Sequence, residues 1–293
     1  MPADIRTCLT PPNILVADGA LGTYLQAQGL PPGSPPELWN IEQPETVRSM
    51  HQAYLEAGAQ ILTTNTFGGN RLRLPAEVNG HPLADLVRQG VELARDVAGE
   101  AAWVAGSMGP TGRLLEPLGD LSCEQAEDAF AEEAALLADA GADLILIETM
   151  GDVLEARAAL LGAQRATRLP VFVTFAFDHN ARTLMGNTAS EVCREMQSLG
   201  ATAIGANCGA GPDAVLVALQ QMVLATSLPL IAQPNAGLPR LLATGETTWD
   251  STPDEFAERA RALIGLGARI IGACCGSTPA HIMAIRAAVA AVR

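Results

Sequence analysis

The sequence has few aromatic residues, few basic residues and no long apolar run. Aromatic residues make up 4% of the 293 residues, so the core must be built from the Ala, Leu, Ile and Val of a chain that is 48% hydrophobic. Only 18 Lys and Arg stand against 32 Asp and Glu, which gives a formal net charge of −14. Because nucleic-acid binding needs clustered basic side chains, we expect no nucleic-acid partner.

Other absences exclude further classes of protein. No apolar run approaches the roughly 18 residues that a membrane span needs, so we expect no contact with a membrane. The segment 1–10 has no apolar stretch of the kind found in secretory signals. Six cysteines in a chain of this length do not make a disulfide framework. We therefore predict a cytoplasmic protein with reduced thiols. The sequence leaves the oligomeric state open.

What the chain does contain is a regular alternation of short apolar segments and helical patterns. Such alternation predicts a parallel sheet, and eight units favour a closed barrel. We therefore predict one domain, residues 1–293, with the α/β fold of a (β/α)8 TIM barrel. A doubly wound open sheet is the alternative, and the lack of a break between two halves disfavours it. The strands are expected at 14–16, 60–64, 103–105, 143–147, 171–177, 203–208, 230–232 and near 270–273.

The helices are expected to follow the strands and to end at glycines. Gly58, Gly141, Gly200 and Gly267 each precede a predicted strand, where glycine commonly ends a helix. Between the first strand and the first helix, Gly22 and the proline-rich stretch 31–36 predict a long loop. The helices are predicted at 45–57, 82–98, 123–140, 152–166, 189–199, 212–225, 253–266 and 278–292.

Three cysteines lie at the ends of two predicted strands. Cys208 follows an apolar segment and precedes a glycine, and Cys274 and Cys275 do the same near the C-terminus. One strand separates the two sites in the predicted ring, so the three thiols are close enough to share an ion. Thiolates favour zinc, and a catalytic zinc keeps its fourth position open. The alternative is that all three are small buried side chains.

Other polar residues gather at the same strand ends. Glu148 is a candidate to pair with a substrate ammonium, or else it makes an internal bond that supports the barrel. The backbone of Asp18, Gly19 and Ala20 is a candidate to receive a substrate carboxylate, or else Asp18 caps a tight turn. Asn235 is a metal ligand, a group that orients a ligand, or a turn residue. The full set is Asp18, Asn65, Ser107, Glu148, Asn207, Cys208, Asn235, Cys274 and Cys275.

Three thiolates around zinc predict a particular chemistry. A metal-bound thiol is deprotonated, so the site would supply a thiolate at neutral pH. Three negative ligands leave the bound sulfur electron-rich, which suits attack on an activated methyl group better than polarisation of a carbonyl.

Seven motifs in order give the chain a resemblance to the homocysteine S-methyltransferase family. It is nearest to the homocysteine-binding barrel of cobalamin-dependent methionine synthase, and next to betaine–homocysteine methyltransferase. The resemblance covers nearly the whole chain. The motifs are Asp18-Gly19-Ala20-Leu21-Gly22-Thr23, Thr64-Asn65-Thr66-Phe67, Gly106-Ser107-Met108-Gly109-Pro110, Glu148-Thr149-Met150, Gly205-Ala206-Asn207-Cys208, Pro234-Asn235-Ala236-Gly237 and Cys274-Cys275-Gly276-Ser277-Thr278-Pro279.

The resemblance implies an enzyme that binds Zn²⁺ through Cys208, Cys274 and Cys275. Homocysteine sulfur would complete the site and accept a methyl group, which gives methionine. The resemblance also implies that Asp18 and Gly19 bind the substrate carboxylate and Glu148 its ammonium. Asn235 would be a stand-in ligand when the substrate is absent.

Two positions beside the cysteine pair are compared with the family pattern, and the first of them bears on the methyl donor. Gly276 matches the methionine-synthase and betaine branches, whereas the S-methylmethionine branch often carries Arg there. Ala273 replaces a common Gly, and its extra methyl group is expected to alter strand packing. No folate- or cobalamin-binding domain lies within these residues, so the methyl group is expected to arrive on a small molecule or on a separate cobalamin-binding protein.

Betaine, S-methylmethionine and methylcobalamin on a partner protein all remain open as donors. Two other functions remain as well. One is a methyltransferase that acts on a different thiol. The other is a non-catalytic zinc–thiol barrel, such as a subunit of a split methionine synthase.

Overall fold

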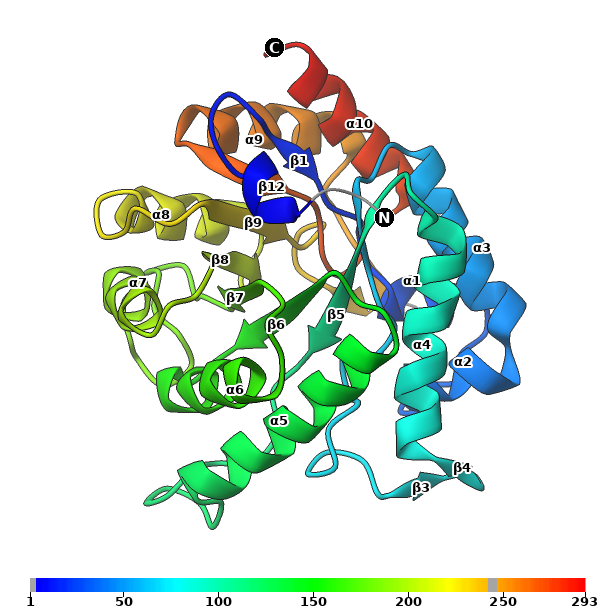
Figure 1. Ribbon diagram of the computed structural model, residues 1–293. Helices are drawn as coiled ribbons and strands as arrows, with labels where there is room; N and C mark the ends of the chain where they lie inside the picture. The colour runs from blue at the N-terminus through cyan, green and yellow to red at the C-terminus, as the bar shows by residue number, and fades with distance from the viewer. Residues whose placement is uncertain (1–3, 242–246, 293) are drawn as a thin grey trace.

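The computed structural model describes residues 4–241 and 247–292, and its centre is an eight-stranded parallel sheet (Figure 1). The remaining residues of the predicted domain, 1–3, 242–246 and 293, lie outside the described part. The strand order is β1, β12, β9, β8, β7, β6, β5, β2. The strands are β1 (Leu15–Val16), β2 (Ile61–Thr63), β5 (Trp103–Met108), β6 (Leu144–Met150), β7 (Val171–Phe175), β8 (Ala203–Cys208), β9 (Leu230–Pro234) and β12 (Ala268–Ile271).

The two ends of this order meet, which closes the sheet into a barrel. Ala17 forms a parallel bridge with Ile61, and the Asp18 N–H donates to the Ile61 carbonyl at 3.1 Å. The predicted TIM barrel is therefore confirmed. The ring of helices around it (Figure 1) is α3 (Pro44–Glu56), α4 (Leu83–Ala98), α5 (Cys123–Asp139), α6 (Val153–Ala166), α7 (Ala189–Ser198), α8 (Pro212–Met222), α9 (Pro253–Gly265) and α10 (Pro279–Ala290).

Local sequence explains where these helices begin and end. Ser122, Thr188 and Thr252 open α5, α7 and α9 with capping boxes, in which each hydroxyl accepts the N–H of a Gln or Glu three residues later. All four glycines expected to end helices have positive φ, between 84° and 102°, so those predictions are confirmed. In the part of the chain that the structure describes, no helix has both the length and the apolar character needed to cross a bilayer.

The segment between β1 and α3 departs from the prediction. It was expected to be a long loop from Gly22 through the proline-rich stretch, yet it contains α1 (Gly22–Ala27), the 3-10 helix η2 (Pro36–Leu38) and α2 (Trp39–Glu42). Leu25 is buried in the main core and Leu38 in a smaller cluster with Val78 and Leu86, and this packing outweighs the weak local helix signal. Two hairpins were also missed: β3 (Glu77–Val78) with β4 (His81–Pro82), and β10 (Arg240–Leu241) with β11 (Thr247–Thr248).

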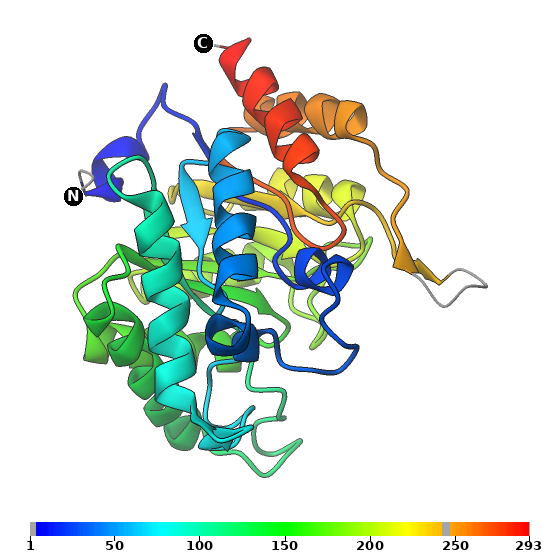
Figure 2. The same cartoon turned by 90° about the vertical axis from the view of Figure 1, so that its right-hand side faces the viewer.

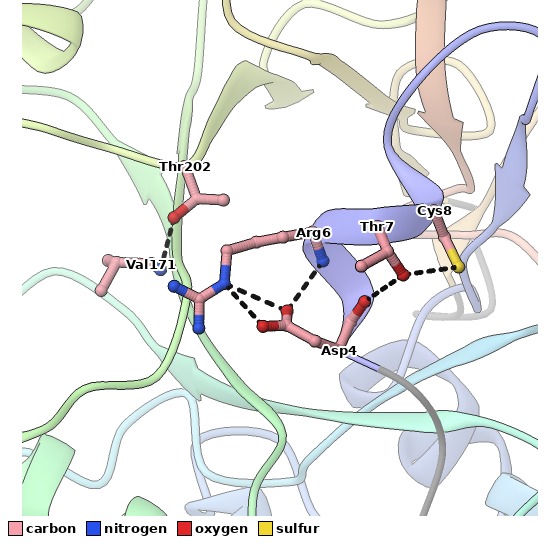
Figure 3. Close-up of polar contacts among 6 residues, drawn as sticks. All are labelled: Asp4, Arg6, Thr7, Cys8, Val171 and Thr202. Carbon is pink, nitrogen blue, oxygen red and sulfur yellow. Dashed lines mark hydrogen bonds and ion pairs between the residues drawn. The ribbon is translucent and has the colours of Figure 1, made fainter.

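The N-terminal segment packs against the end of the barrel where the strands begin. Ile5, the first residue of the 3-10 helix η1 (Ile5–Cys8), and Leu9, the residue after it, are buried with inward residues of the strands such as Phe172. Asp4 holds the helix together, because its carboxylate accepts hydrogen bonds from the backbone and side chain of Arg6, both at 3.0 Å (Figure 3). In Figure 2 this segment lies at one end of the molecule and the β10–β11 hairpin at the other.

The strands change from apolar to polar as they approach their carboxyl ends. Along β6, Leu144 and Leu146 belong to the inner apolar cluster, and Glu148, next in the same alternation, lines a cavity. Side chains along β12 change in the same way: Ile270 belongs to the inner apolar cluster, and Cys274, just past the end of the strand, lines the cavity. The chemistry-bearing side chains therefore meet at one end of the barrel, as is usual for this fold.

Candidate active site

A cavity of about 620 Å³ opens at the carboxyl ends of the strands. Seven of the eight predicted site residues line it, from four different strand ends: Asp18, Gly19, Ala20, Glu148, Cys208, Cys274 and Cys275. Asn235 lies outside the lining. The remainder of the wall includes the segment between β1 and α3, which was predicted only as a loop.

The three cysteine sulfurs form one cluster. Cys208 ends β8, and Cys274 and Cys275 follow β12, with β9 between the two strands. The three Sγ atoms lie within 4.8 Å of one another; Cys208 Sγ is 2.7 Å from Cys274 Sγ and 3.6 Å from Cys275 Sγ. Cys208 has a φ of 53°, in the left-handed region that non-glycine residues seldom occupy and that is often found at functional sites.

The electrostatics of this cluster suit a bound cation. Hydrogen bonds from Cys208 and Cys274 lower the pKa of the Cys275 thiol to about 3. The hydrogen bond with Cys208 raises the pKa of Cys274 well above its usual value. Three thiolates this close would repel one another, and a divalent cation would stabilise all three in the charged form.

The spacing of the sulfurs also fits zinc. Tetrahedral zinc at about 2.3 Å from each sulfur places the sulfurs about 3.8 Å apart, which is close to the 3.6 Å between Cys208 and Cys275; Cys208 and Cys274, now 2.7 Å apart, would separate by about 1 Å on binding the ion. Asn235 adds a second observation. Its Nδ2 donates to the Gly209 carbonyl at 3.2 Å, but its Oδ1 is buried and finds no hydrogen-bond partner in the described part of the chain. Its neighbour Ala236 donates its N–H to the Cys275 carbonyl at 2.9 Å, so this turn is attached to the cysteine cluster.

Glu148, on β6, is held by side chains from β5 on one side and from β8, two strands away, on the other. Ser107 Oγ donates to its Oε1 at 2.5 Å, and Asn207 Nδ2 donates to its Oε2 at 3.3 Å. Burial raises the pKa of this carboxyl to about 7, and the Ser107 hydrogen bond limits the rise. A cation beside Glu148 would complete this environment, because a buried carboxylate is stable only when it is paired or hydrogen-bonded.

Asn207 also fixes the end of β6. Its Oδ1 accepts the Thr149 N–H at 2.9 Å, and its Nδ2 donates to Thr149 Oγ1 at 2.7 Å. Thr149 has a φ of 63°, which is costly for a β-branched residue, so these bonds hold a strained backbone in place. The sequence identified Asn207 as a strand-end residue and gave it no role.

Asp18 makes its bonds within the barrel. Its carboxylate accepts the Thr63 N–H at 2.7 Å and the Thr63 hydroxyl at 2.8 Å. Burial raises the pKa of Asp18 to about 7, and the bonds from Thr63 limit that rise. This carboxylate therefore ties β1 to β2 directly beneath the cavity. The sequence did not indicate Thr63.

The turn that follows Asp18 offers one free backbone donor. The Ala20 N–H donates to Ser277 Oγ at 3.0 Å, and the Asp18 N–H is used in closing the barrel. The Gly19 N–H has no partner within the described residues. A Cβ at Gly19 would lie 2.6 Å from Ser277 Oγ and 2.9 Å from the Tyr54 ring, so only glycine fits. Tyr54 donates its hydroxyl proton to the Ala20 carbonyl at 2.7 Å, which supports the turn from α3.

Gly276 and Ala273, the two positions compared with the family pattern, have clear structural settings. Gly276 has a φ of 79°, and a Cβ there would lie 2.0 Å from the Trp249 ring. Trp249 therefore excludes any larger residue beside Cys275. Ala273 is 2% exposed and packs within the main core cluster, so its methyl group is accommodated.

Comparison with known proteins agrees with this geometry. A family model described as homocysteine S-methyltransferase matches residues 15–289. The methionine synthase of Mycobacterium tuberculosis is 37% identical over 301 residues, and that of Mycobacterium leprae is 36% identical over 298 residues. These matches cover 96% and 95% of this chain but 25% and 24% of the relatives, so the chain spans about a quarter of their length.

A solved structure is similar over its whole length. The metallated form of the homocysteine methyltransferase MmuM from Escherichia coli superposes with a TM-score of 0.79 at 28% identity. The match covers 97% of this chain and 99% of that one. The apo form of the same protein gives a TM-score of 0.76.

Proposed function

Because the chain belongs to the homocysteine S-methyltransferase family, we propose that it transfers a methyl group to the thiol of homocysteine and produces methionine with the help of zinc. The observation that carries this proposal is the group of three cysteine sulfurs at the wall of a cavity that also contains Glu148 and the free Gly19 N–H. One end of the cavity suits a thiol, and the other groups suit an amino acid.

The proposed metal ligands are Cys208, Cys274 and Cys275. Zinc, when bound, lowers the pKa of a coordinated thiol and so supplies a thiolate at neutral pH. The sulfur spacing and the unpartnered Asn235 Oδ1 support this assignment. We propose Asn235 as the group that occupies the fourth position before the substrate arrives. Because the site needs reduced thiols, we also propose a cytoplasmic location.

The amino-acid part of the substrate is assigned to two groups. We assign the substrate ammonium to Glu148, whose carboxylate is already oriented by Ser107 and Asn207. The substrate carboxylate is assigned to the Gly19 N–H, in the turn that Asp18 and Ala20 hold rigid. Together these contacts would aim the substrate sulfur at the cysteines and fix it for attack on a methyl carbon.

The test is methionine formation by the purified, zinc-loaded protein. Homocysteine is supplied with betaine, S-methylmethionine or methylcobalamin in separate reactions, and methionine is measured by mass spectrometry. Turnover with one donor would establish the reaction. Zinc-dependent binding of homocysteine without turnover would indicate that a separate cobalamin-binding protein delivers the methyl group. Failure to bind homocysteine would reject the proposed acceptor.

Cysteine variants separate the metal site from the fold. Cys208→Ala and Cys275→Ala are expected to lose zinc and activity together while circular dichroism still reports the barrel. Cys123→Ala is the matched control, because Cys123 is an exposed free thiol on α5, away from the cluster. Full zinc content and turnover in either cluster variant would show that the three-thiolate site is wrong.

A further inference from the structure

One side of the cavity mouth is formed by an arginine that covers an aromatic ring. Among the described residues that line the cavity, Phe67 alone is aromatic. The Arg73 guanidinium carbon lies 5.0 Å from the centre of that ring. Arg73 Nη1 also donates to the Pro110 carbonyl at 3.0 Å, which fixes the guanidinium over the ring. The aromatic face is therefore already occupied by a cation that belongs to the protein.

A buried carboxyl of the cavity wall lies close to this arginine: a Cβ at Gly68 would lie 3.0 Å from Glu37 Oε1 and 3.4 Å from Arg73 Nε. Glu37 lines the cavity, is 2% exposed, and accepts the Gly68 N–H at 2.6 Å. Burial raises the pKa of Glu37, and the Arg73 charge opposes that rise. The same positive charge acts on the buried carboxyls of Glu133 and Glu155. Without Arg73, the Phe67 ring would be open to the cavity, and the Glu37 carboxyl would lose the positive charge that opposes the rise in its pKa.

These are the features that bind methylated cations. A quaternary ammonium or sulfonium group binds well against an aromatic face, and best where negative charge is near. In this protein Arg73 already supplies the cation for that position. We propose, on the basis of the function proposed above, that Arg73 is a specificity residue that keeps free onium methyl donors out of the cavity. The mouth would then accept a methyl group whose carrier has no positive charge beside Phe67.

The reaction that Arg73 would suppress is a simple displacement. With trimethylsulfonium as donor, the homocysteine thiolate forms a new S–CH₃ bond, and one CH₃–S⁺ bond breaks. The electron pair leaves with dimethyl sulfide, and the product is methionine. Trimethylsulfonium is the suitable probe because, unlike betaine and S-methylmethionine, it has no carboxylate that Arg73 could bind.

The experiment compares three variants of the zinc-loaded protein. Arg73→Gln removes the charge, Arg73→Lys keeps it, and Arg71→Gln removes a neighbouring exposed arginine. Arg71 is paired with Glu132 at 2.8 Å and does not line the cavity, so it is a matched control. We expect kcat/KM for trimethylsulfonium to rise about tenfold in Arg73→Gln and to stay at the wild-type level in the other two.

A binding measurement keeps this inference separate from the proposed function. Tetramethylammonium transfers no methyl group here, and its affinity can be measured by calorimetry without homocysteine. Arg73→Gln should bind it about tenfold more tightly than the wild type does. Equal affinity in both proteins, or wild-type use of trimethylsulfonium as efficient as that of Arg73→Gln, would overturn the role of Arg73. A tighter affinity together with absent homocysteine binding would retain that role and reject only the methyltransferase assignment.

Discussion

The imidazole of His51 should make the barrel sensitive to acid. His51 lies on α3 and is fully buried, and among the described residues neither of its ring nitrogens has a hydrogen-bond partner. Burial lowers its pKa from 6.5 to about 4, because a charged imidazole without a partner is costly in an apolar interior. The same helix carries Tyr54, which supports the turn at Gly19, so α3 is also relevant to the site.

The size of the effect follows from the two pKa values. Below pH 6.5 the unfolded chain binds a proton at His51, and the native protein does not until about pH 4. The stability that depends on neutral His51 is therefore fully present above pH 6.5 and is lost as the pH falls toward 4. At about 1.36 kcal/mol per pH unit, the full loss is about 3.4 kcal/mol, of which about 2 kcal/mol is lost by pH 5.

The assay is urea-induced unfolding of the zinc-free protein at pH 7.5 and pH 5. His51→Leu removes the titrating group, so its stability should fall by about 2 kcal/mol less between the two pH values than that of the wild type. Met50→Leu is the control, because Met50 is a buried neighbour on α3 that does not titrate. Burial raises the pKa of Asp18 and of Glu148, so these two carboxyls favour the native state as the pH falls, opposite to His51. Their effect is the same in the wild type and in His51→Leu, so it cancels when the two proteins are compared. An equal pH dependence in His51→Leu and the wild type would refute the reasoning.

Three further predictions concern the site. Asn207→Ala should raise KM for homocysteine about tenfold with a smaller change in kcat, because Glu148 would lose one of its two orienting partners. Steady-state kinetics would measure both constants, and an unchanged KM would argue against the orienting role of Asn207. Gly276→Ala should lower the free energy of unfolding by about 2–3 kcal/mol and weaken zinc binding, because a Cβ beside Trp249 must displace the loop of Cys275. Urea unfolding would detect the loss of stability, and metal titration would detect the weaker zinc binding. A second substitution in the same chain, Trp249→Ala, should recover part of the loss. Removal of zinc with a chelator should abolish methyl transfer while the fold is retained, and added zinc should restore methyl transfer. Activity that survives in protein shown by elemental analysis to be metal-free would contradict the zinc assignment.

Several features of the barrel could be predicted from local sequence. The eight apolar segments, the glycines that end helices and the Gly-flanked cysteines all depend on residues near one another in the chain. Hydrophobic periodicity and helix-end signals act over such short distances, so they can be read without the fold. The segment between β1 and α3 was misjudged because burial of Leu25 and Leu38 against distant residues stabilises its short helices.

The sequence by itself therefore determined the barrel and the type of residue at each strand end, including the three thiols. Only the tertiary structure decided how these residues pair. Thr63 became the partner of Asp18, Ser107 and Asn207 became the partners of Glu148, and Arg73 came to cover Phe67. The first two arrangements join residues from different strands that lie more than 40 positions apart in the chain. Closure of the ring brings them together, and no local pattern of side chains specifies which of them will meet.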